Sequence, residues 1–599
     1  MNPEAILAQS YKLLAAGDPL AAETALAPLW NASVDKPPKA MHLLALIRRA
    51  QHRLMEAEQW LRSAIAAEPG DHEAHYNLGD LLQSGGFHDP AVDCFRAALR
   101  LSPGLDLARL GLTRSLTALG RGAEAEREAR ALLARKVTPE ALRALGGALN
   151  AQGRTKEALD AFEEALRFRP GYLGAQHDRA LALQKLGRSE EALKVYAGTE
   201  MAGVTAPEIA LSWAMALVDL GRIGEAEAVL ERAVAKNPQH VRIQTDLARL
   251  RWMRSGDAEA FVADLETAVA NHPANEALRA ALAELLYRAD QIDYAQSVLR
   301  DGLNIAPESA ILWRMLGFLL DESGKPAEAV VALERAFAQA QDVETRRYLA
   351  HALLRIGEPD RALEQIRFGL GQSAHDQIWL AYLFTAQRMR GDAEFERLFN
   401  IETCVRVVDL APPPGYRDIA AFNAALAPRL DALHVLTQHP LNQTLRDGTQ
   451  TLRDLTEVGD PTIDQFLALA KSAVRDFASA LPDEPFHPFF GRKRSDVAFN
   501  GSWSVRLRPG GRHVNHVHPR GWISSAYYVR LPNADPADPK HAGWFKLGEP
   551  RLPIPNCPAL GYIEPKIGRL VLFPSYMWHG TEPFARDDRL TIAFDAVPV

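Results

Sequence analysis

A repeat of about 34 residues runs through the first two thirds of the chain. Within each of two blocks, glycines that open a Gly-x-x-x-x-Ala step recur every 33 or 34 residues, and prolines keep a similar interval. Apolar residues between them follow helical spacing. This pattern predicts an α-solenoid of stacked helical hairpins. The marker residues are Gly120, Gly153, Gly187, Gly221, Gly324 and Gly357, with Pro69, Pro103, Pro238, Pro273 and Pro307.

Each marker residue has an expected physical role. We expect the small Gly and Ala side chains to let the two helices of a hairpin approach closely. Proline cannot continue a helix, so it should end one repeat and turn the chain into the next. A single hairpin cannot bury its apolar face alone, whereas stacked neighbours bury it jointly.

The segment HEAHYNLGDLLQSGGFHDPAVDCFRAALRLSPG at residues 72–104 resembles the tetratricopeptide repeat family. By this resemblance, residues 1–400 form about eleven units, and their concave groove holds a peptide or a partner protein. The net charge of −8 over residues 1–400 favours a basic peptide segment. The alternative is that the helices serve as a spacer or a dimerisation element.

Composition excludes several classes of protein. The chain has 68 Lys and Arg against 75 Asp and Glu, so neither half has the basic excess that nucleic acid binding needs. Its three cysteines are far apart in sequence, which excludes a disulfide scaffold and a cysteine-rich zinc site. We find neither a signal peptide nor a stretch near the ~20 apolar residues that span a bilayer, and expect a cytoplasmic protein without membrane contact.

The pattern changes near residue 400, which predicts a second domain over residues 401–599. CVRVVDL at 404–410 reads as a strand, and helices are expected near 418–433 and 461–480. From about residue 497 the chain reads as short strands separated by turn residues, which predicts a jelly roll or barrel at 497–599. The expected strands are NGSWSVRLR, HVNHVH, ISSAYYVRL, GWFKL, GRLVLF and RLTIAFDA.

Three histidines in this second domain have the spacing of a metal site. Residues i and i+2 of a strand point to the same side, so His516 and His518 should project together, while His513 and Asn515 point away. His579, after the strand GRLVLF, would supply a third ligand. Three protein ligands on one face leave the other coordination positions of a metal open.

Ten residues beyond His579, Arg589 and Thr591 share one side of their expected strand. A guanidinium and a hydroxyl that point into a barrel form a carboxylate clamp with charge-assisted hydrogen bonds. A buried arginine with no acidic neighbour in sequence is costly, so we expect it to await an anionic ligand. An open metal site together with such a clamp suits a bidentate keto-acid.

The segments HVNHVHPRGWISSAYYV, GRLVLFPSYMWHG and DDRLTIAF resemble the 2-oxoglutarate/Fe(II)-dependent dioxygenases, in particular the prolyl-hydroxylase-like bacterial branch fused to tetratricopeptide repeats. The resemblance covers about residues 435–599, with HPLNQTLRDGTQTL at 439–452 as its weaker leading part. It implies a double-stranded β-helix fold with flanking helices. The implied activity is hydroxylation of an aliphatic carbon. Because the repeat array is larger than a small-molecule enzyme needs, we expect the repeats to present a protein or peptide side chain to this domain, with a small-molecule substrate as the alternative.

The resemblance also assigns roles at the site. It implies that Fe(II) binds through His516, His518 and His579, and that 2-oxoglutarate and O2 take the remaining positions. Arg589, aided by Thr591 and Tyr528, would hold the distal carboxylate of 2-oxoglutarate. Succinate and carbon dioxide would form as the substrate carbon is hydroxylated.

This sequence departs from the family at His518, where the superfamily has a carboxylate. Imidazole also binds Fe(II), so a triad of histidines is chemically reasonable. The alternatives are that His518 is no ligand, that a carboxylate such as Glu564 replaces it, or that the site has lost activity.

Two other classes of protein fit part of the pattern. A cupin-type metalloenzyme acting on a small molecule shares the jelly roll and the His-x-His pair, but needs a glutamate where Trp522 and Ile523 stand, and has no use for Arg589. A non-catalytic repeat scaffold with a structural metal would need a fourth ligand, for which Cys557 is available.

For several neighbouring side chains we weigh a purely structural role against a role at the site. We expect His541 to be exposed to solvent and Tyr527 to pack in the sheet. His513 is expected to lie behind the ligands or at the surface and not to be a ligand itself. Trp503, Trp522 and Trp578 are expected in the core or at the rim, although Trp522 and Trp578 adjoin the proposed ligands and could line a substrate pocket. Asn500 and Arg506, on a strand leading into the site, are further candidates.

Overall fold

In the computed structural model the chain forms two compact units, Met1–Ala216 and Leu217–Val599. The predicted domain boundary at residue 400 stays a prediction, and residues 439–444 of the leading segment lie outside the described residues. The structure describes residues 2–32, 36–201, 206–434, 445–533 and 539–599.

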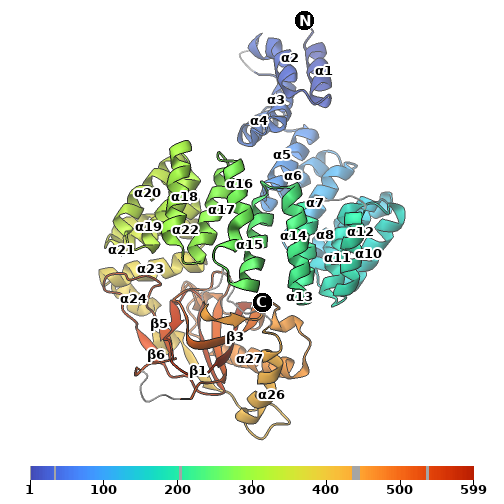
Figure 1. Ribbon diagram of the computed structural model, residues 1–599. Coiled ribbons are helices and arrows are strands. Elements are labelled where there is room, and N and C mark those ends of the chain that lie inside the picture. Colours follow the sequence, from blue (N-terminus) through green and yellow to red (C-terminus); the bar gives the residue numbers. More distant parts are fainter. Residues whose placement is uncertain (1, 33–35, 202–205, 435–444, 534–538) are drawn as a thin grey trace. The chain divides into compact units, whose positions relative to one another are not determined.

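The first unit consists of helices that follow one another as hairpins (Figure 1), and α13 continues across its boundary. This confirms the predicted all-helical repeats; the number of units, about eleven, stays a prediction. The helices are α1 (Pro3–Ala15), α2 (Pro19–Ala32), α3 (Pro38–Ala50), α4 (Leu54–Ala67), α5 (His72–Ser84), α6 (His88–Leu101), α7 (Asp106–Ala118), α8 (Gly122–Arg135), α9 (Pro139–Ala151), α10 (Thr155–Phe168), α11 (Leu173–Lys185), α12 (Ser189–Met201) and α13 (Pro207–Asp219).

The marker residues of the repeat lie at helix ends. Pro103, for example, falls between α6 and α7, where it ends one repeat as predicted. The glycines differ from the expectation of close approach: Gly120 has a φ of +73° and its α-carbon faces open space, so it is required for a left-handed turn. Close packing falls to the alanine five residues later, and Ala125 is fully buried.

Other glycines do permit close approach between helices. A β-carbon at Gly146 of α9 would overlap the ring of Phe162 in α10, which is itself buried. Gly111 has the same relation to Phe95. In each case a small residue on one helix makes room for a large apolar residue on a neighbouring helix, which fixes how the repeats stack.

The substitution Gly146→Ala is therefore expected to destabilise the protein. The added methyl group would have to displace the Phe162 ring from a close-packed site, which costs about 1–3 kcal/mol of unfolding free energy. Urea denaturation followed by circular dichroism measures this change. In the matched control Gly171→Ala, the new β-carbon meets no atom of the described residues within 4 Å, and stability should stay within about 0.5 kcal/mol of the native chain.

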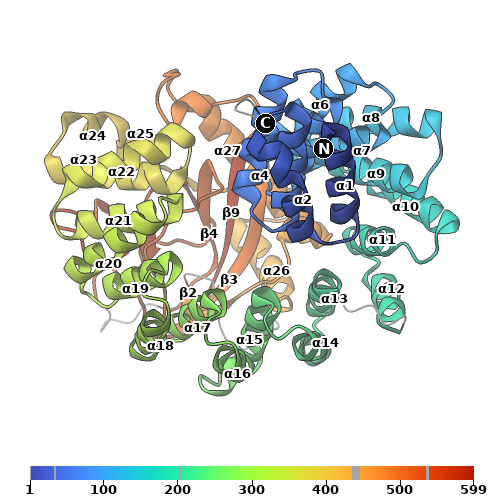
Figure 2. The same ribbon diagram turned by 90° about the horizontal axis from the view of Figure 1, so that it is seen from above.

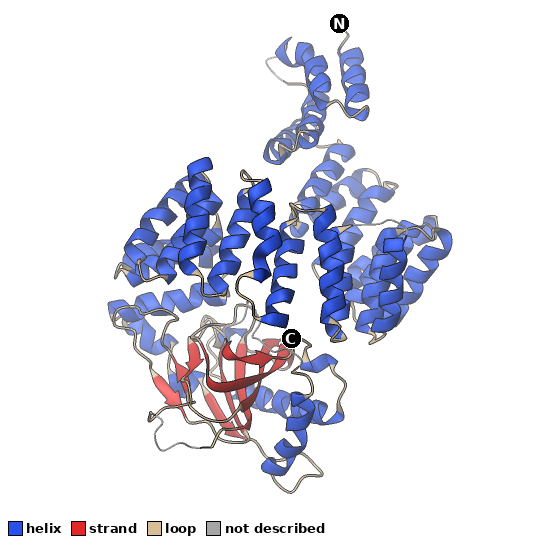
Figure 3. Cartoon of the chain, viewed as in Figure 1, coloured by secondary structure: helices blue, strands red, loops and turns tan. Residues whose placement is uncertain are grey.

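The second unit continues the hairpins and then changes character (Figures 1 and 3). Its helices are α14 (Ile223–Lys236), α15 (Val241–Ser255), α16 (Ala263–Asn271), α17 (Glu276–Arg288), α18 (Ile292–Ile305), α19 (Ala310–Glu322), α20 (Pro326–Gln339), α21 (Val343–Arg355), α22 (Pro359–Gln372), α23 (Gln377–Arg390), α24 (Ala393–Leu398), α25 (Ile401–Cys404), α26 (Ile419–Asp431) and α27 (Pro461–Ala480). Short 3-10 helices are η1 (Ala260–Val262), η2 (Leu455–Glu457) and η3 (Phe490–Arg492).

The strands form two antiparallel sheets among the described residues, in the orders β1-β7-β4-β9-β3-β2 and β6-β5-β8. The predicted mainly-β domain with flanking helices is thereby confirmed. β2, β6 and β8 were not expected from the sequence. The strands are β1 (Arg406–Asp409), β2 (Leu445–Gln450), β3 (Val497–His513), β4 (Ile523–Arg530), β5 (Phe545–Leu547), β6 (Gly561–Ile563), β7 (Arg569–Pro574), β8 (His579–Thr581) and β9 (Arg589–Pro598).

Helices α26 and α27 share an apolar cluster with the larger sheet, whose strand β4 runs between β7 and β9. Phe466 of α27 packs on the ring of Tyr527 at 4.7 Å between centroids, and the Tyr527 hydroxyl donates to Asn423 of α26. Tyr527 therefore belongs to the helix-covered face. Its neighbour Tyr528 points to the other face, as alternation along a strand requires.

The last repeats pack against the β domain within the same unit. Figures 1 and 2 both show α23 beside α24, and residues of these helices share an apolar cluster with β4, β7 and β9. Ile554 and Cys557, from the loop between β5 and β6, join the apolar cluster formed by α15 to α23. None of the helices in the described part of the chain is long and apolar enough to cross a bilayer.

Candidate active site

A pair of backbone hydrogen bonds brings two distant histidines together. The His516 amide donates to the His579 carbonyl at 2.8 Å, and the His579 amide donates back to the His516 carbonyl at 3.1 Å. The His518 amide donates to Ser575 at 2.9 Å. The expected strand HVNHVH is wrong beyond His513, because the segment is a loop in which His516 alone forms a bridge.

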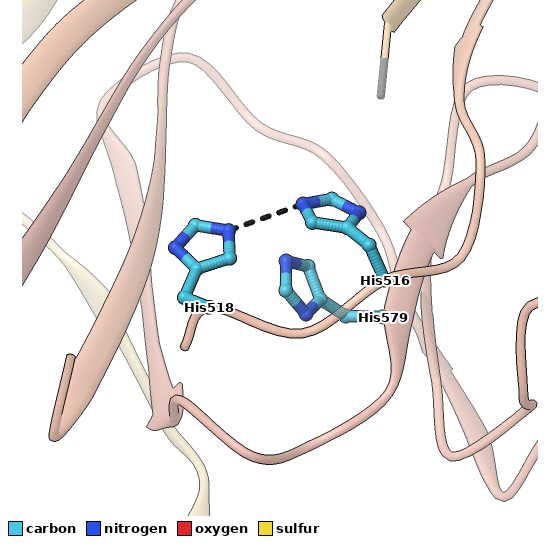
Figure 4. A group of neighbouring side chains, drawn as sticks. All are labelled: His516, His518 and His579. Atoms are coloured by element: carbon cyan, nitrogen blue, oxygen red, sulfur yellow. Dashed lines mark hydrogen bonds between the residues drawn. The ribbon is translucent and has the colours of Figure 1, made fainter. Parts of the chain in front are cut away.

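The three imidazoles converge (Figure 4). One nitrogen from each of His516, His518 and His579 lies within 4.8 Å of the other two, and the Nε2 atoms of His516 and His518 are 3.1 Å apart. All three side chains are largely shielded from solvent. The structure therefore brings together the residues that the sequence proposed as a metal triad.

The second nitrogen of each imidazole has an acceptor. A carbonyl oxygen only accepts hydrogen bonds, so the Nδ1 atoms of His516 and His579 must carry the proton, and Asp595 fixes the same tautomer in His518. The Nε2 lone pairs consequently face one another, which is unfavourable unless a cation lies between them. The donor set therefore fits a metal ion. The acceptors are Val514 O for His516 at 2.8 Å, Met577 O for His579 at 2.9 Å, and Asp595 Oδ1 for His518 at 2.5 Å.

Burial favours the neutral form of the His516 and His579 imidazoles. Desolvation, reinforced by the neighbouring His518, lowers the pKa of His516 to about 3. Desolvation, with His516 as the next cause, also lowers the pKa of His579 well below its ordinary value. The neutral imidazole is the form that binds a metal, so ligands in this environment need not lose a proton first.

Asp595 is a site residue that the sequence reasoning missed. It is buried in β9, and it also accepts from the Ser524 hydroxyl at 2.6 Å. A signal for it existed: residues alternate along a strand, so Asp595 shares a face with Arg589 and Thr591. Its position behind His518 is that of a carboxylate orienting a ligand imidazole.

Arg589 is fully buried and lacks a carboxylate partner among the described residues. It is 2% exposed, its Nη1 donates to the Gly543 carbonyl at 2.8 Å, and its Nε has no hydrogen-bond partner. The hydroxyl of Tyr528, 1% exposed, is likewise without a partner. Burial lowers the pKa of the Arg589 guanidinium and raises that of the Tyr528 hydroxyl. Two orphaned donors in a dry site fit an anionic ligand.

One cavity of about 320 Å³ connects these two features. The three histidines, Arg589, Tyr528 and Thr591 all line it. This volume suits a small organic ligand. The Thr591 hydroxyl donates to the Val505 carbonyl at 3.4 Å and faces the cavity with an acceptor position to spare.

Other candidates divide between the cavity and its surroundings. The expectation that His513 points away is wrong, because it lines the cavity with its ring centroid 5.9 Å from that of His516. Trp503 and Asn500 line the same cavity, and the Trp503 ring lies 5.7 Å from the His518 ring. Arg506 instead faces Asp431, and its Nη1 lies 3.7 Å from Asp431 Oδ1.

The remaining candidates lie elsewhere. Trp522 is a buried core residue that donates to the Phe489 carbonyl, and Trp578 donates to Thr385 of α23. His541 stacks on Tyr562 at 4.1 Å. Glu564, the suggested replacement ligand, is exposed, and its Oε2 lies 3.5 Å from Lys566 Nζ. Cys557 packs among the repeat helices.

Several solved structures match parts of the chain at low sequence identity. A tetratricopeptide repeat protein from Parabacteroides merdae matches with 17% identity over 41% of this chain and 97% of that one, at a TM-score of 0.38. Yeast Tom70 matches with 12% identity over 67% and 97%, at a TM-score of 0.35. No curated protein matches the sequence significantly.

Two sequence families match separate parts of the chain. "Tetratricopeptide repeat" matches residues 42–106, 110–172 and 211–276. "Putative 2OG-Fe(II) oxygenase" matches residues 501–595, the stretch that carries the three histidines and Arg589. The chain thus combines tetratricopeptide repeats with a segment that matches the "Putative 2OG-Fe(II) oxygenase" family.

Proposed function

We propose that the protein is an Fe(II)- and 2-oxoglutarate-dependent dioxygenase that hydroxylates a protein or peptide side chain. The observation that carries this proposal is one cavity with two functional ends. Three Nε2 lone pairs converge at the first end, and Arg589 and Tyr528 leave donors unsatisfied at the second. The match to an oxygenase family over the same residues supports it.

His516, His518 and His579 would hold Fe(II) through Nε2. Their Nδ1 acceptors fix each ring in the tautomer that presents a lone pair, and Asp595 orients the His518 ring. Three ligands leave coordination positions open on one side. When bound, Fe(II) with 2-oxoglutarate and O2 supplies the oxidising chemistry that places a hydroxyl group on a carbon.

Arg589 and Tyr528 would bind the distal carboxylate of 2-oxoglutarate. A carboxylate in this place would satisfy the Arg589 Nε and the Tyr528 hydroxyl and would neutralise a buried cation. Thr591, on the same wall, would add a hydroxyl contact. This demand for an anion separates the proposal from a cupin acting on a small molecule, which makes no use of Arg589.

The structural-metal alternative lacks its fourth ligand in the described part of the chain. The group that could hold a metal comprises three histidines, whereas a closed zinc site takes four ligands. Cys557, the suggested fourth, belongs to the apolar cluster of the repeat helices. An open three-ligand site supports catalysis over scaffolding.

The repeats would bring the substrate. Tetratricopeptide repeats indicate binding of another protein, and the last of them pack on the oxygenase domain. We propose that a peptide held by the repeat groove presents a side chain to the cavity, where Trp503 and Asn500 form part of the wall.

Succinate release tests the proposed function. The full chain, purified without oxygen and supplied with Fe(II), 2-oxoglutarate and air, should form succinate even without substrate and faster with a lysate-derived peptide fraction. Succinate formation that needs both Fe(II) and 2-oxoglutarate supports the proposal. Stoichiometric zinc that resists chelators, with no succinate, would favour the scaffold.

Asp595 makes a specific prediction about the departure from the family at His518. His518→Asp restores the usual carboxylate but sets it beside the buried Asp595, which loses its imidazole partner. Repulsion between the two carboxylates should raise the pKa of one of them and weaken Mn(II) binding by about tenfold or more. Adding Asp595→Asn should recover most of that affinity. Equal Mn(II) affinity in the single and double variants, measured by electron paramagnetic resonance titration, would show that Asp595 does not act on this position.

A further inference from the structure

Helix α23, in the last of the repeats, lies against the segment that carries His579. This segment comprises the turn between β7 and β8 and the start of β8 at His579, and the apolar side chains of the turn pack on the repeats. Tyr576 is 1% exposed and packs on Phe384 of α23 with ring centroids 4.7 Å apart. Trp578 stacks on Tyr382 of the same helix, with centroids 6.2 Å apart and an angle of 26° between the rings. Both neighbours of Met577 are therefore clamped by α23.

A hydrogen bond fixes the Trp578 ring. Its indole Nε1 donates to the Thr385 hydroxyl of α23 at 3.1 Å, and that hydroxyl in turn donates to the Ala381 carbonyl at 2.7 Å. Thr385 is 4% exposed, so the chain of two hydrogen bonds is shielded from water. An indole N–H in such a place has few other acceptors, so this hydrogen bond fixes the orientation of the ring.

A second tie acts on the backbone of the same residue. The Trp578 carbonyl accepts from the Gly548 amide at 2.7 Å. The Gly548 carbonyl accepts from Arg388 of α23 at 3.0 Å, and the same guanidinium donates to the Pro558 carbonyl at 2.7 Å. The side chain and the backbone of Trp578 are thus both connected to one repeat helix.

The loop between β5 and β6 is held by the neighbouring repeats in the same way. Arg551 forms a bidentate ion pair with Glu322 at the end of α19, and its Nη1 lies 2.7 Å from Glu322 Oε2. Arg355 of α21 donates to the Pro553 carbonyl at 3.4 Å. On its other side this loop meets the metal-site region, since Asn515 donates to Glu549 at 2.9 Å and to the Pro550 carbonyl at 3.2 Å.

We propose that α23 is an outer support of the metal centre and that Trp578 and Thr385 are positioning residues for His579. The Nδ1 of His579 donates to the carbonyl of Met577, which lies between the two clamped aromatic residues. Holding Tyr576 and Trp578 therefore holds the acceptor that sets the orientation of the His579 ring. The inference rests on the proposed function and extends it: these repeats shape the site as well as carrying substrate.

Titration of the full chain with Mn(II), followed by electron paramagnetic resonance, tests this inference without activity. Thr385→Val removes the acceptor of the indole, and Trp578→Phe removes the donor while keeping a ring on Tyr382. Each should weaken Mn(II) binding about tenfold. This is the lower end of the range expected when a residue that supports a metal ligand through hydrogen bonds is lost. Thr385→Ser, which keeps the hydroxyl, should bind Mn(II) as the native chain does.

Trp313→Phe is the matched control. Trp313 belongs to α19 and donates to the Pro307 carbonyl at 2.7 Å within the repeats, so its loss should leave Mn(II) affinity unchanged. Circular dichroism confirms that each variant is folded. Native affinity in both Thr385→Val and Trp578→Phe would overturn the support role while leaving the proposed function intact. Equal weakening by Thr385→Ser and Thr385→Val would also overturn it. A native chain that binds no Mn(II) would overturn the proposed function and this inference together.

Discussion

His579→Ala is expected to abolish both metal binding and 2-oxoglutarate turnover. The substitution removes one of three converging Nε2 atoms and leaves His516 and His518, which cannot enclose an ion from the opposite side. Loss of a partner behind a ligand already costs about 10- to 100-fold in metal affinity, so loss of the ligand itself should exceed that range. Succinate formation should fall to the level without enzyme.

The measurement is an Mn(II) titration together with a succinate assay on the same preparation. His541→Ala is the matched control, because His541 stacks on Tyr562 away from the cavity and its loss should change neither quantity. Succinate formation by His579→Ala at a rate near that of the native chain would contradict the assigned triad.

Arg589→Met is expected to separate cosubstrate binding from metal binding. Methionine fills much of the space but cannot pair with a carboxylate, so 2-oxoglutarate should bind about 3 kcal/mol more weakly, roughly a hundredfold in Kd. Mn(II) affinity should be unchanged, because the histidines keep their own partners. The unfolding free energy should stay equal or rise, since the substitution removes a buried cation that has no acidic partner among the described residues.

Isothermal titration with 2-oxoglutarate in the presence of Mn(II), and urea denaturation without ligand, check the two parts of this prediction. Arg530→Met is the control: Arg530 pairs with Asp431 near the surface and should not affect 2-oxoglutarate. If Arg589→Met bound 2-oxoglutarate as tightly as the native chain, the anion-binding role of this residue would be excluded.

Local patterns carried most of the fold. The regular interval between Gly120 and the equivalent glycines of later repeats predicted the helical hairpins. It could do so because the same turn geometry and close packing recur from repeat to repeat. The strands β3, β4, β5, β7 and β9 followed from alternation and turn residues. β6 and β8 have three residues each, which is too short a run to recognise, and β2 (LRDGTQ) contains Asp447 and Gly448, residue types that are depleted in strands.

The candidate site was predictable where the spacing of residues along a strand determines which way their side chains point. Arg589 and Thr591 lie on one strand, and alternation placed both toward the cavity. The same rule misplaced His513, because the chain leaves the strand after it and turns as a loop. Asp595 was missed although alternation includes it, since nothing in the sequence says which inward carboxylate lies behind a ligand.

No pattern in the sequence predicted the contacts between the repeats and the β domain. Trp578 bonds to Thr385 across 193 positions of the chain, and Arg551 bonds to Glu322 across 229. Such pairs depend on how two folded parts pack, which neither periodicity nor motif spacing encodes. The sequence accordingly suggested Trp578 as a pocket residue, whereas it faces α23.

Anomalous diffraction from crystals of the full chain grown with Mn(II) and 2-oxoglutarate tests the central claim most directly. The account predicts one anomalous peak in this domain, bonded to the Nε2 atoms of His516, His518 and His579, with the distal carboxylate of 2-oxoglutarate on Arg589. A peak bonded to other side chains, or 2-oxoglutarate with its carboxylate away from Arg589, would contradict it.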